Sequence, residues 1–414
     1  MEEKVHVMVT VVGARTEHWI ELFAALANRP DVTVTVVAAD VSELTRTELD
    51  LVSSRSTRFR YHVVPHLLGE GRTGHMASVL FRTDVSRVVE QPPDVVHIIG
   101  EAAYLSTWQV IRSCRRRWPG VPVSLYAAQN IVIGFPAPFP TIERYSYRQV
   151  DHMFPITPAA LYVLRVKGYA GNASVVPLGV DPKLFRPGPT GDAGRRFTVG
   201  FVGRLEHHKG IADLLRAAES VDCDVAFIGA GALRPLVERA IERRPGRIVL
   251  HSWADHHDLP GHLNRMDALA LPSVEVVQRN VLPWVGIPLR EQFGRVLVEA
   301  MACGTPVVGS DVGEIPHVIG DAGLTFTAGD WVGLANCLSR LRDDSELAAR
   351  LSANGLARVN RLFSWESIAD AMCDAWNGLR GAGDRRSATG LPRHRGEPHR
   401  APRAAAAQQL EAKP

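Results

Sequence analysis

Runs of apolar residues alternate with amphipathic segments along the first 170 residues. Runs such as KVHVMVTVVG and PDVVHIIG are almost continuously apolar, which is typical of strands in a parallel sheet covered by helices on both faces. Segments such as TEHWIELFAALANRP have apolar positions at helical spacing, and strands that alternate with helices indicate an α/β fold. The pattern predicts strands over 4–13, 32–40, 93–100 and 122–130, helices over 16–30 and 104–120, and a strand followed by a helix within 152–169.

A segment rich in proline and glycine, residues 175–196, interrupts this alternation and predicts a linker between two domains. The alternation then restarts, so the second half has the same organisation as the first. Two doubly wound domains joined by a hinge place a cleft between the carboxyl ends of their sheets, where such folds bind ligands. The second half is predicted to contain strands over 196–204, 223–231, 247–253, 267–273, 306–311 and 324–329, and helices over 210–220, 233–245, 259–266 and 294–303.

The size and composition of the chain fit a globular protein of two domains. Its 414 residues are long for one hydrophobic core, and its 46% apolar and 22% charged residues are ordinary values. No stretch approaches the roughly 18 apolar residues of a membrane-spanning helix. The N-terminus lacks the basic start, apolar core and cleavage site of a signal peptide, so we expect a cytoplasmic protein. The expected parts are an N-terminal domain (1–178), a linker (179–195), a C-terminal domain (196–362), a C-terminal helix (363–379) and a tail (380–414).

The positive charge of the chain is concentrated in its tail. From Arg380 onward there are eight Arg and Lys against three Asp and Glu, so the first 379 residues carry a net charge of −2 although the whole chain carries +3. A body without a basic surplus argues against a nucleic-acid enzyme. The tail is rich in Gly, Pro, Ala and Arg without an apolar period, which predicts disorder. We expect any membrane contact to be peripheral.

The cysteines do not indicate a disulfide framework or a metal site. There are five of them, scattered and without a CxxC pair, which fits a reduced compartment and predicts neither disulfides nor bound zinc. Cys303, in AMACGTP, is interpreted as a small residue packed at a helix end rather than as a nucleophile.

The first strand-to-helix turn of the second half, FVGRLEHHKG, carries two cations. Arg204 and Lys209 lie on a loop that opens a helix at Gly210. Fixed cations beside a helix N-terminus suit a diphosphate, because positive charge and free backbone N–H groups both favour anions. A solvated basic turn explains these residues equally well from the sequence alone.

Other motifs are weaker. FIGAGAL offers Gly229 and Gly231 after a strand but lacks the third glycine of a dinucleotide fingerprint, and TVVGAR has only Gly13, so a nicotinamide enzyme is poorly supported. The DxD formed by Asp222 and Asp224 lies between a helix and a strand, on the side away from the expected cleft. We interpret it as a turn rather than a metal site.

The stretch REQFGRVLVEAMACGTPVVGSDVGEIP places two glutamates around the start of a helix. Gly294 is predicted to open the helix, which leaves Glu291 in the preceding loop and Glu299 within the first turns. Carboxylates accept paired hydrogen bonds from vicinal hydroxyls, and a helix N-terminus between them tolerates phosphate. The two glutamates and the helix N-terminus between them therefore match a ligand in which a diphosphate joins a hydroxyl-bearing sugar to a ribose. Such a ligand is a nucleotide sugar. The simpler alternative, a solvent-facing Glu299, fits poorly with its apolar neighbours in VLVEAMAC.

Five features in the same order resemble a known family. They are the ExFGxxxxE pattern, the GTPVV stop, SDVGEIP, the VGRL…KG turn and the VVPLGVD linker. Together they resemble retaining glycosyltransferases of family 4, from about residue 150 to residue 330. Those enzymes have the GT-B fold, in which two Rossmann-like domains face a central cleft. The resemblance implies that the C-terminal helix crosses back to the first domain.

The resemblance also implies roles for particular residues. Arg204 and Lys209 would hold the donor diphosphate, Glu291 the transferred sugar and Glu299 the ribose. The nucleotide base would lie between residues 252–255 and the pair Pro272 and Ser273. No metal would be required, since the cations and the helix N-terminus neutralise the leaving diphosphate. The implied catalytic residues are Arg204, Lys209 and Glu291, and the implied donor-binding set is Gly203, Arg204, Lys209, Gly229, Pro272, Ser273, Glu291, Phe293, Gly294, Arg295 and Glu299.

The chain departs from the family in its first half. Members often carry a Gly-Gly turn after the first strand and a histidine near the end of a mid-domain strand. Here Gly13 stands alone, and the strand ends in Gln129 and Asn130, whose amides bind hydroxyls but cannot act as bases. Glu101, after a strand, is a further acceptor-side candidate or a helix-start charge. Residues 274–290 are expected to form a long loop that shapes access to the site, or a tolerated insertion.

The sequence therefore predicts an α/β protein that transfers a sugar from a nucleoside diphosphate to an acceptor hydroxyl with retention at the anomeric carbon. Polysaccharide, glycolipid and natural-product biosynthesis are the expected settings. Two alternatives remain open: a nucleotide-sugar epimerase of the same fold, and a non-catalytic protein that binds nucleotide sugars. No covalent nucleophile is evident, which favours same-face displacement, and the resemblance implies that the leaving phosphate takes the acceptor's proton. The base, the sugar and the acceptor are not determined by these motifs.

Overall fold

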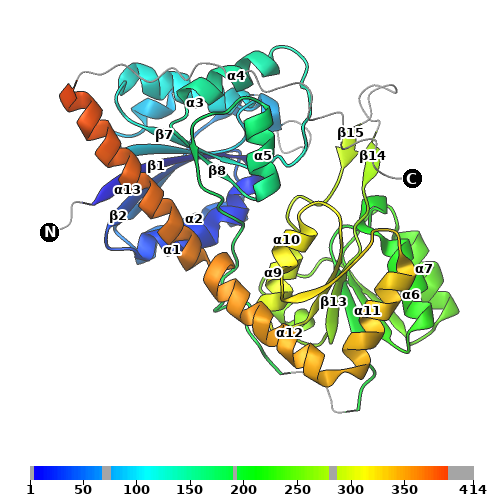
Figure 1. Cartoon of the computed structure of the whole chain (residues 1–414). Helices are drawn as coiled ribbons and strands as arrows, with labels where there is room; N and C mark the ends of the chain where they lie inside the picture. The colour runs from blue at the N-terminus through cyan, green and yellow to red at the C-terminus, as the bar shows by residue number, and fades with distance from the viewer. Residues whose placement is uncertain (1–3, 68–75, 190–193, 279–286, 390–414) are drawn as a thin grey trace. The chain divides into compact units, whose positions relative to one another are not determined.

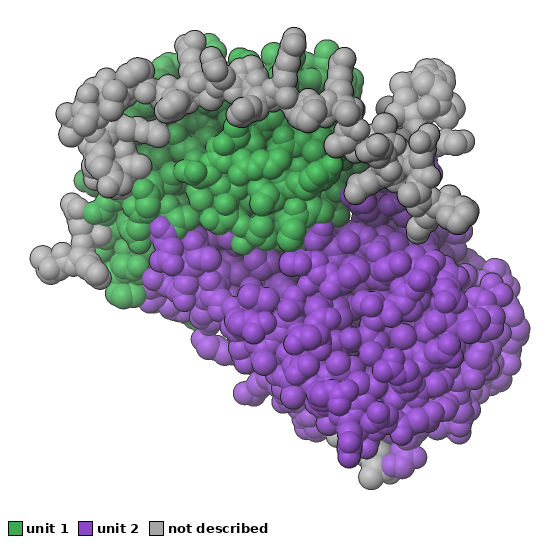
Figure 2. Space-filling view, in the orientation of Figure 1, with its two compact units in different colours: residues 1–17, 30–175, 375–414 green, residues 18–29, 176–374 purple. Residues whose placement is uncertain are grey.

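The chain forms two compact units, each built on one parallel sheet (Figures 1 and 2). The structure, a computed structural model, describes residues 4–67, 76–189, 194–278 and 287–389. Unit 1 consists of residues 1–17, 30–175 and 375–414, and unit 2 of residues 18–29 and 176–374. Within the described ranges, every helix is too short or too polar to cross a membrane.

The sheet of unit 1 has seven strands in the order β3-β2-β1-β6-β7-β8-β9, all parallel. Every residue of β6, β7 and β8 is buried, which explains why these strands lack a polar alternation. The elements of this unit are β1 (Val5–Val12), β2 (Val32–Ala39), α2 (Glu43–Arg55), β3 (Phe59–Val63), β4 (His66–Leu67), β5 (Leu80–Phe81), β6 (Val95–Ile99), α3 (Leu105–Arg117), β7 (Val123–Ala127), α4 (Phe139–Gln149), β8 (His152–Pro155), α5 (Pro158–Val166) and β9 (Asn172–Ala173).

The sheet of unit 2 has six parallel strands in the order β12-β11-β10-β13-β16-β17. The elements of this unit are α1 (Ile20–Asn28), β10 (Thr198–Val202), α6 (Ile211–Ser220), β11 (Asp224–Ile228), α7 (Arg234–Arg243), β12 (Ile248–His251), α8 (Leu259–Leu263), β13 (Ala268–Leu271), β14 (Val276–Gln278), β15 (Ile287–Leu289), α9 (Arg295–Ala302), β16 (Val307–Ser310), α10 (Ile315–Ile319), β17 (Gly323–Phe326), α11 (Trp331–Asp343) and α12 (Ser345–Arg358).

Both sheets are doubly wound, as the alternation predicted. In unit 1 the chain builds β1, β2 and β3 in one direction and then returns to add β6 on the other side of β1. In unit 2 the same reversal lies between β10 and β13. Folds of this kind bind ligands at the carboxyl ends of the strands beside the reversal. The topology thus marks one edge of each sheet as a place for a site.

The last helix, α13 (Trp365–Thr389), begins in unit 2, and its residues from Ala375 onward are in unit 1. Trp376 anchors it on the sheet of unit 1, because its indole N–H donates to Ser124 Oγ at 3.2 Å and its ring lies 5.4 Å from that of His97. The prediction that this helix ends at residue 379 is wrong, since residues 380–389 continue it. The rest of the tail, residues 390–414, lies outside the described residues.

The expectation of a loop over 274–290 needs correction. Val276–Gln278 and Ile287–Leu289 pair as a small antiparallel ribbon, β14 with β15, in which Val277 is opposite Pro288. The segment between the two strands, residues 279–286, lies outside the described residues. Several elements of ordinary amphipathic or mixed pattern were not predicted, namely α2, β3, α4, α10, α11 and α12.

Candidate functional site

Three loops of unit 2 converge where the strand order reverses. The strands β10, β13 and β16 are neighbours in a parallel sheet, so their carboxyl ends lie at the same edge. The loops that follow them carry the GRLEHHKG turn, the Pro272–Ser273 pair and the SDVGEIP segment. Topology therefore brings together motifs that are about 70 and 40 residues apart in the chain.

Gly210 allows two of these loops to touch. It has φ +66°, and a Cβ atom on it would lie 1.8 Å from the carbonyl oxygen of Pro272. The backbone N–H of Val274 donates to the carbonyl of His208 at 2.9 Å, which fixes the same contact from the other side. Only glycine accepts both this backbone conformation and this approach. The turn that carries Lys209 is thus held against the Pro272–Ser273 loop.

The glycines of FIGAGAL also serve close packing. Gly229 has φ +142°, and its Cβ would lie 2.0 Å from the carbonyl oxygen of Gly203. Gly231 has φ +155°, and its Cβ would lie 2.6 Å from the carbonyl oxygen of Leu205. The loop after β11 therefore rests on the turn that presents Arg204, which gives this glycine pair a structural role.

Lys209 and Glu291 form the central ion pair of the site. Lys209 Nζ lies 2.5 Å from Glu291 Oε2, and Ser273 Oγ donates to the same oxygen at 3.1 Å. Their side chains are only 16% and 11% exposed. The sequence assigned these two residues to different parts of a ligand, whereas the structure joins them directly. The ammonium group of Lys209 is therefore already engaged by a carboxylate.

The position of Glu291 is set by the neighbouring loops. Gly313 has φ +60°, and its Cβ would lie 2.1 Å from the carbonyl oxygen of Glu291. Ser310 Oγ donates to the carbonyl of Ser273 at 2.5 Å, which holds the Ser273 loop in turn. Ser273 is fully buried, so its hydroxyl is occupied by Glu291 rather than presented to solvent.

Arg204 is exposed, and it forms no ion pair within the part of the chain that the structure describes. Its guanidinium group is therefore available to an anion. Burial first, and then the charges of Lys209 and Arg204, lower the pKa of His208. His208 thus stays neutral at pH 7, and the positive charge of the turn resides on Arg204 and Lys209.

The helix α9 starts where the sequence predicted. Gly294 is its N-cap residue, with φ +78°, and Arg295 is the first helical residue. The first backbone N–H groups of a helix have no partner within the helix and favour negative charge. Phe293 is buried, and its ring packs edge-on against Phe363 with centroids 5.9 Å apart. This packing fixes the direction from which the chain enters the helix.

Glu299 is buried in the second turn of α9, so the solvent-facing alternative is wrong. Only 6% of the residue is exposed, and burial raises the pKa of its carboxyl group while the charge of Arg295 opposes that change. Arg295 Nε lies 3.1 Å from Glu299 Oε1, one helical turn away. Arg295 therefore supplies the positive charge that a buried carboxylate requires.

A second carboxylate shares Arg295 and was missed by sequence reasoning. Glu21, on α1, accepts a hydrogen bond from Arg295 at 3.3 Å and from the indole N–H of Trp365 at 2.5 Å. The ring of His256 lies within hydrogen-bond distance, at 2.9 Å. These contacts outweigh the effect of burial and lower the pKa of Glu21. No local pattern indicated this group, because Glu21 and Arg295 are 274 residues apart.

The two expected base-binding segments differ in exposure. Residues 252–255 follow β12, at the edge of the sheet, and Trp253 is 56% exposed there. Pro272 and Ser273 are buried. Asp222 lies in a turn, as expected, whereas Asp224 starts β11, and both pair with Arg247.

The acceptor-side candidates lie at one edge of the sheet of unit 1. β1, β6 and β7 are neighbours in that sheet, and Gly13, Glu101 and Gln129 follow their carboxyl ends. Glu101 Oε1 accepts a hydrogen bond from the N–H of Ala128 at 2.8 Å, so its carboxylate ties two strand ends together rather than capping a helix. Asn130 is buried.

Gln129 is part of a polar group that the sequence did not reveal. Its side-chain oxygen accepts a hydrogen bond from Lys167 Nζ at 3.1 Å, and Lys167 also pairs with Glu143 at 2.8 Å. Tyr147 donates to the same Glu143 oxygen at 3.3 Å. Lys167 and Glu143 are 8% and 13% exposed, so their charges depend on each other.

Comparison with known families agrees with this geometry. Residues 187–358 match the family model described as glycosyl transferases group 1, and that range contains the predicted donor-binding residues, whereas Glu21, Phe363 and Trp365 lie outside it. The chain carries a glycosyl transferases group 1 domain. This glycosyltransferase is 29% identical over 381 residues to a D-inositol 3-phosphate glycosyltransferase from Stackebrandtia nassauensis, with 82% of each chain covered. It is 31% identical over 233 residues to a phosphatidyl-myo-inositol mannosyltransferase from Mycolicibacterium smegmatis, with 53% of this chain and 55% of the relative covered.

Solved structures place the glycosyltransferase in the GT-B fold. One similar structure is Anabaena Alr3699/HepE in complex with UDP, with a TM-score of 0.67 and 16% identity, covering 90% of this chain and 100% of that one. The fold predicted from the sequence, two Rossmann-like doubly wound domains, is therefore confirmed.

Proposed function

We propose that this enzyme is a metal-independent, retaining glycosyltransferase of family 4 that acts in the cytoplasm on a nucleoside-diphosphate sugar and an acceptor hydroxyl. The observation that supports the proposal most is the convergence of Lys209, Ser273 and Glu291 beside the N-terminus of α9 at the reversal point of the second sheet. This arrangement supplies cations, free N–H groups and carboxylates within one small region, which is the chemistry of a nucleotide sugar.

In this proposal the donor diphosphate binds Arg204 and Lys209. Arg204 is exposed and unpaired within the described residues, and Lys209 is held in place by Glu291. Neutralising the charge that develops on the departing diphosphate is the main catalytic task, and fixed cations perform it without reorganisation. The same cations and the first turn of α9 take the place of a metal ion. The complex of the Anabaena protein with UDP supports a nucleoside diphosphate as the leaving group.

The two glutamates have different parts. Glu299, which lies 3.1 Å from Arg295 Nε, accepts hydrogen bonds from the ribose hydroxyls. Glu291 directs its second oxygen to a hydroxyl of the transferred sugar, while Oε2 remains bonded to Lys209 and Ser273. Each carboxylate thus lies beside a positive charge, and a carboxylate accepts several hydrogen bonds in all.

The acceptor is assigned to unit 1, at the edge formed by Gly13, Glu101 and Gln129. Glu101 is committed to Ala128 and Gln129 to Lys167, so neither is an obvious general base. We therefore favour same-face displacement: the acceptor oxygen bonds to the anomeric carbon, the bond to the diphosphate breaks, and a diphosphate oxygen takes the acceptor proton. Two relatives are named for inositol-containing molecules, so inositol phosphates and phosphatidylinositol are the first acceptors to test.

The first experiment is a thermal-shift screen of the full chain against UDP-, GDP-, TDP- and ADP-sugars, with and without EDTA. A ligand that binds only the folded protein raises the melting temperature. We expect a shift with one nucleotide family that EDTA leaves unchanged. Absence of any shift contradicts the donor site, and loss of the shift with EDTA contradicts metal independence.

Turnover then tests catalysis, and the anomeric configuration of the product tests retention. Lys209→Ala is expected to lower kcat at least a hundredfold, the usual effect of removing a group that stabilises transition-state charge. Lys183→Ala is the matched control, because Lys183 is 79% exposed in a loose surface pair with Glu366. Equal activity of the two variants contradicts the assignment of Lys209. An inverted product contradicts same-face displacement.

A further inference from the structure

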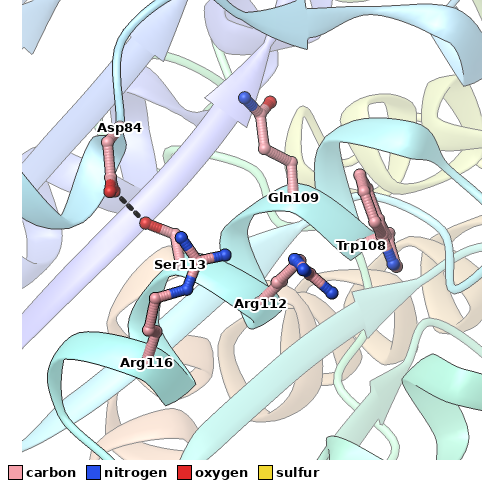
Figure 3. A pocket seen from close by; sticks show the side chains of 6 residues that line it. All are labelled: Asp84, Trp108, Gln109, Arg112, Ser113 and Arg116. Carbon is pink, nitrogen blue, oxygen red and sulfur yellow. Dashed lines mark hydrogen bonds between the residues drawn. The ribbon is translucent and has the colours of Figure 1, made fainter.

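A pocket on unit 1 is lined by two arginines that form no hydrogen bond or ion pair with the residues that the structure describes. The pocket has a volume of about 250 Å³ and is lined by one face of α3 and by the segment after β5 (Figure 3). Residues 108, 112 and 116 of α3 are successive members of that face, since each is one helical turn after the last. The full lining is Asp84, Trp108, Gln109, Arg112, Ser113 and Arg116.

The floor and wall of the pocket are fixed by internal hydrogen bonds. Gln109 is bonded to both backbone groups of Phe81, accepting from its N–H at 2.8 Å and donating to its carbonyl at 2.7 Å. The hydroxyl of Ser113 donates to Asp84 Oδ1, as Figure 3 shows. The N–H and the hydroxyl of Ser86 donate to the same oxygen at 3.1 and 2.7 Å. The polar groups at the base of the pocket are therefore already satisfied.

The two arginines of the lining have no such hydrogen bonds within the described residues. Arg112 and Arg116 are exposed, and neither forms an ion pair or a hydrogen bond within the described parts of the chain. Arg112 only lies over the ring of Trp108, 5.8 Å from its centre, which holds the guanidinium at the pocket wall. Their neighbour Arg115 shows the contrast, because it pairs with Asp151 at 2.7 Å and donates to two backbone carbonyls.

The lining of the pocket suits a phosphate group. Two guanidinium forks one turn apart offer several N–H donors to a tetrahedral group, and arginine binds phosphate in a bidentate manner. Asp84 contributes one negative charge, but its Oδ1 is directed to Ser86 and Ser113, and Arg87 lies 3.8 Å from its Oδ2. Asp84 Oδ2 can accept a hydrogen bond from a hydroxyl group of the molecule that carries the phosphate.

We propose that this pocket binds the phosphate group of a phosphorylated polyol, with Arg112 and Arg116 on the phosphate and Asp84 on a hydroxyl. The donor residues belong to unit 2 and the pocket to unit 1, so this is a second anion site that does not depend on the proposed donor site. The phosphorylated polyol is either a soluble sugar phosphate or the head group of an acidic phospholipid. Both sources present the same groups to the pocket, a phosphate and a nearby hydroxyl.

The test uses the full chain and two probes. Isothermal titration with glycerol 3-phosphate measures the soluble source, and co-sedimentation with vesicles of phosphatidylcholine containing phosphatidylglycerol measures the lipid source. The pocket variant is Arg112→Ala with Arg116→Ala. The matched control is Arg117→Ala with Arg148→Ala, which removes the same charge from exposed positions outside the pocket.

We expect saturable binding of at least one probe, weakened at least tenfold in the pocket variant and less than twofold in the control. Binding of glycerol 3-phosphate supports a soluble phosphate, and binding of vesicles alone supports a lipid head group. An equal loss in both double variants means general charge attraction and overturns the proposal. Absence of binding to either probe, or binding that survives in the pocket variant, overturns it as well.

Discussion

Replacing Arg295 by Met tests the electrostatic balance around Glu299. The substitution keeps an apolar stem of similar shape and removes the charge that lies 3.1 Å from the buried carboxylate. Removing one partner of a buried ion pair costs about 3–5 kcal/mol of the free energy of unfolding. The actual cost has a lower ceiling, because Glu299 can take up a proton instead of remaining charged.

The largest loss of unfolding free energy that Arg295→Met can cause through Glu299 depends on pH. Protonating a carboxyl group whose ordinary pKa is 4.5 costs about 3.4 kcal/mol at pH 7 and about 1.4 kcal/mol at pH 5.5, from 1.36 kcal/mol per unit. In the variant the pKa of folded Glu299 lies further above its unfolded value, since the opposing charge of Arg295 is gone. The folded state then holds a proton that the unfolded state has released, so stability falls as pH rises from 4.5 through the folded pKa.

The assay is urea unfolding of wild type and Arg295→Met at several values between pH 5.5 and pH 8. We expect a destabilisation of up to about 1.4 kcal/mol at pH 5.5 that grows to as much as 3 kcal/mol at pH 7. Arg234→Met is the matched control, because Arg234 and Glu238 form the same i,i+4 pair on the surface of α7, with about half of each side chain exposed. The control should cost no more than about 0.5 kcal/mol at any of these pH values.

A second variant identifies the group responsible. Adding Glu299→Gln to Arg295→Met removes the carboxyl that titrates in this range, so the part of the loss that grows between pH 5.5 and pH 8 should disappear. The lost contact between Arg295 and Glu21, whose pKa is lowered in the wild type, should leave a part that does not change with pH. In Arg295→Met alone, a loss that does not change with pH, or one no larger than that of Arg234→Met, would falsify the assignment of Arg295 as the positive charge that lowers the pKa of Glu299.

Three further predictions follow from the site. Glu299→Gln alone should leave the melting temperature unchanged or higher, because it relieves the burial of a carboxyl whose pKa is raised while Arg295 keeps its pair with Glu21. It should weaken nucleotide-sugar binding at least tenfold by titration calorimetry, and tight binding would contradict the ribose assignment. Lys209→Ala should lower urea stability because Glu291 is left buried and uncompensated, and adding Glu291→Gln should restore much of that stability without restoring turnover. Gly210→Ala should prevent soluble expression or lower the melting temperature steeply, because its Cβ would lie 1.8 Å from the carbonyl oxygen of Pro272. Gly246→Ala is the control, because Gly246 has a similar φ of +75° but open space around it. This control should lower the free energy of unfolding by only about 1 kcal/mol.

Much of the candidate site was accessible from the sequence because its motifs are local. The start of α9 at Arg295 follows from the single glycine before an apolar run, and the burial of Glu299 follows from its apolar neighbours. The exposed Arg204 and the ordered Lys209 both come from one turn of ten residues. Such features depend on residues close in the chain, whose spacing the helix or strand period translates directly into position.

The sequence did not reveal which groups bond to which. Lys209 and Glu291 were assigned separately, although they pair across 82 residues, and Gln129 was identified without Lys167 or Glu143. Ion pairs between distant segments leave no periodic signal, because any nearby residue of opposite charge satisfies them. The β14 and β15 ribbon was missed for a related reason, since two short strands flanking a long connection resemble a loop until they pair.

The amino-acid sequence by itself determined the α/β class, the doubly wound order of both sheets, the existence of two domains and the loops that carry polar chemistry. Hydrophobic periodicity and turn residues are sufficient for these, because they act over a few residues at a time. Tertiary structure alone decided that Arg295 is shared by Glu299 and Glu21, that Lys209 is held by Glu291, and that Arg112 and Arg116 line a pocket without an ion pair to any residue that the structure describes. Those outcomes depend on which strand ends and helix faces the fold brings within a few ångströms, and that is a property of the packed chain.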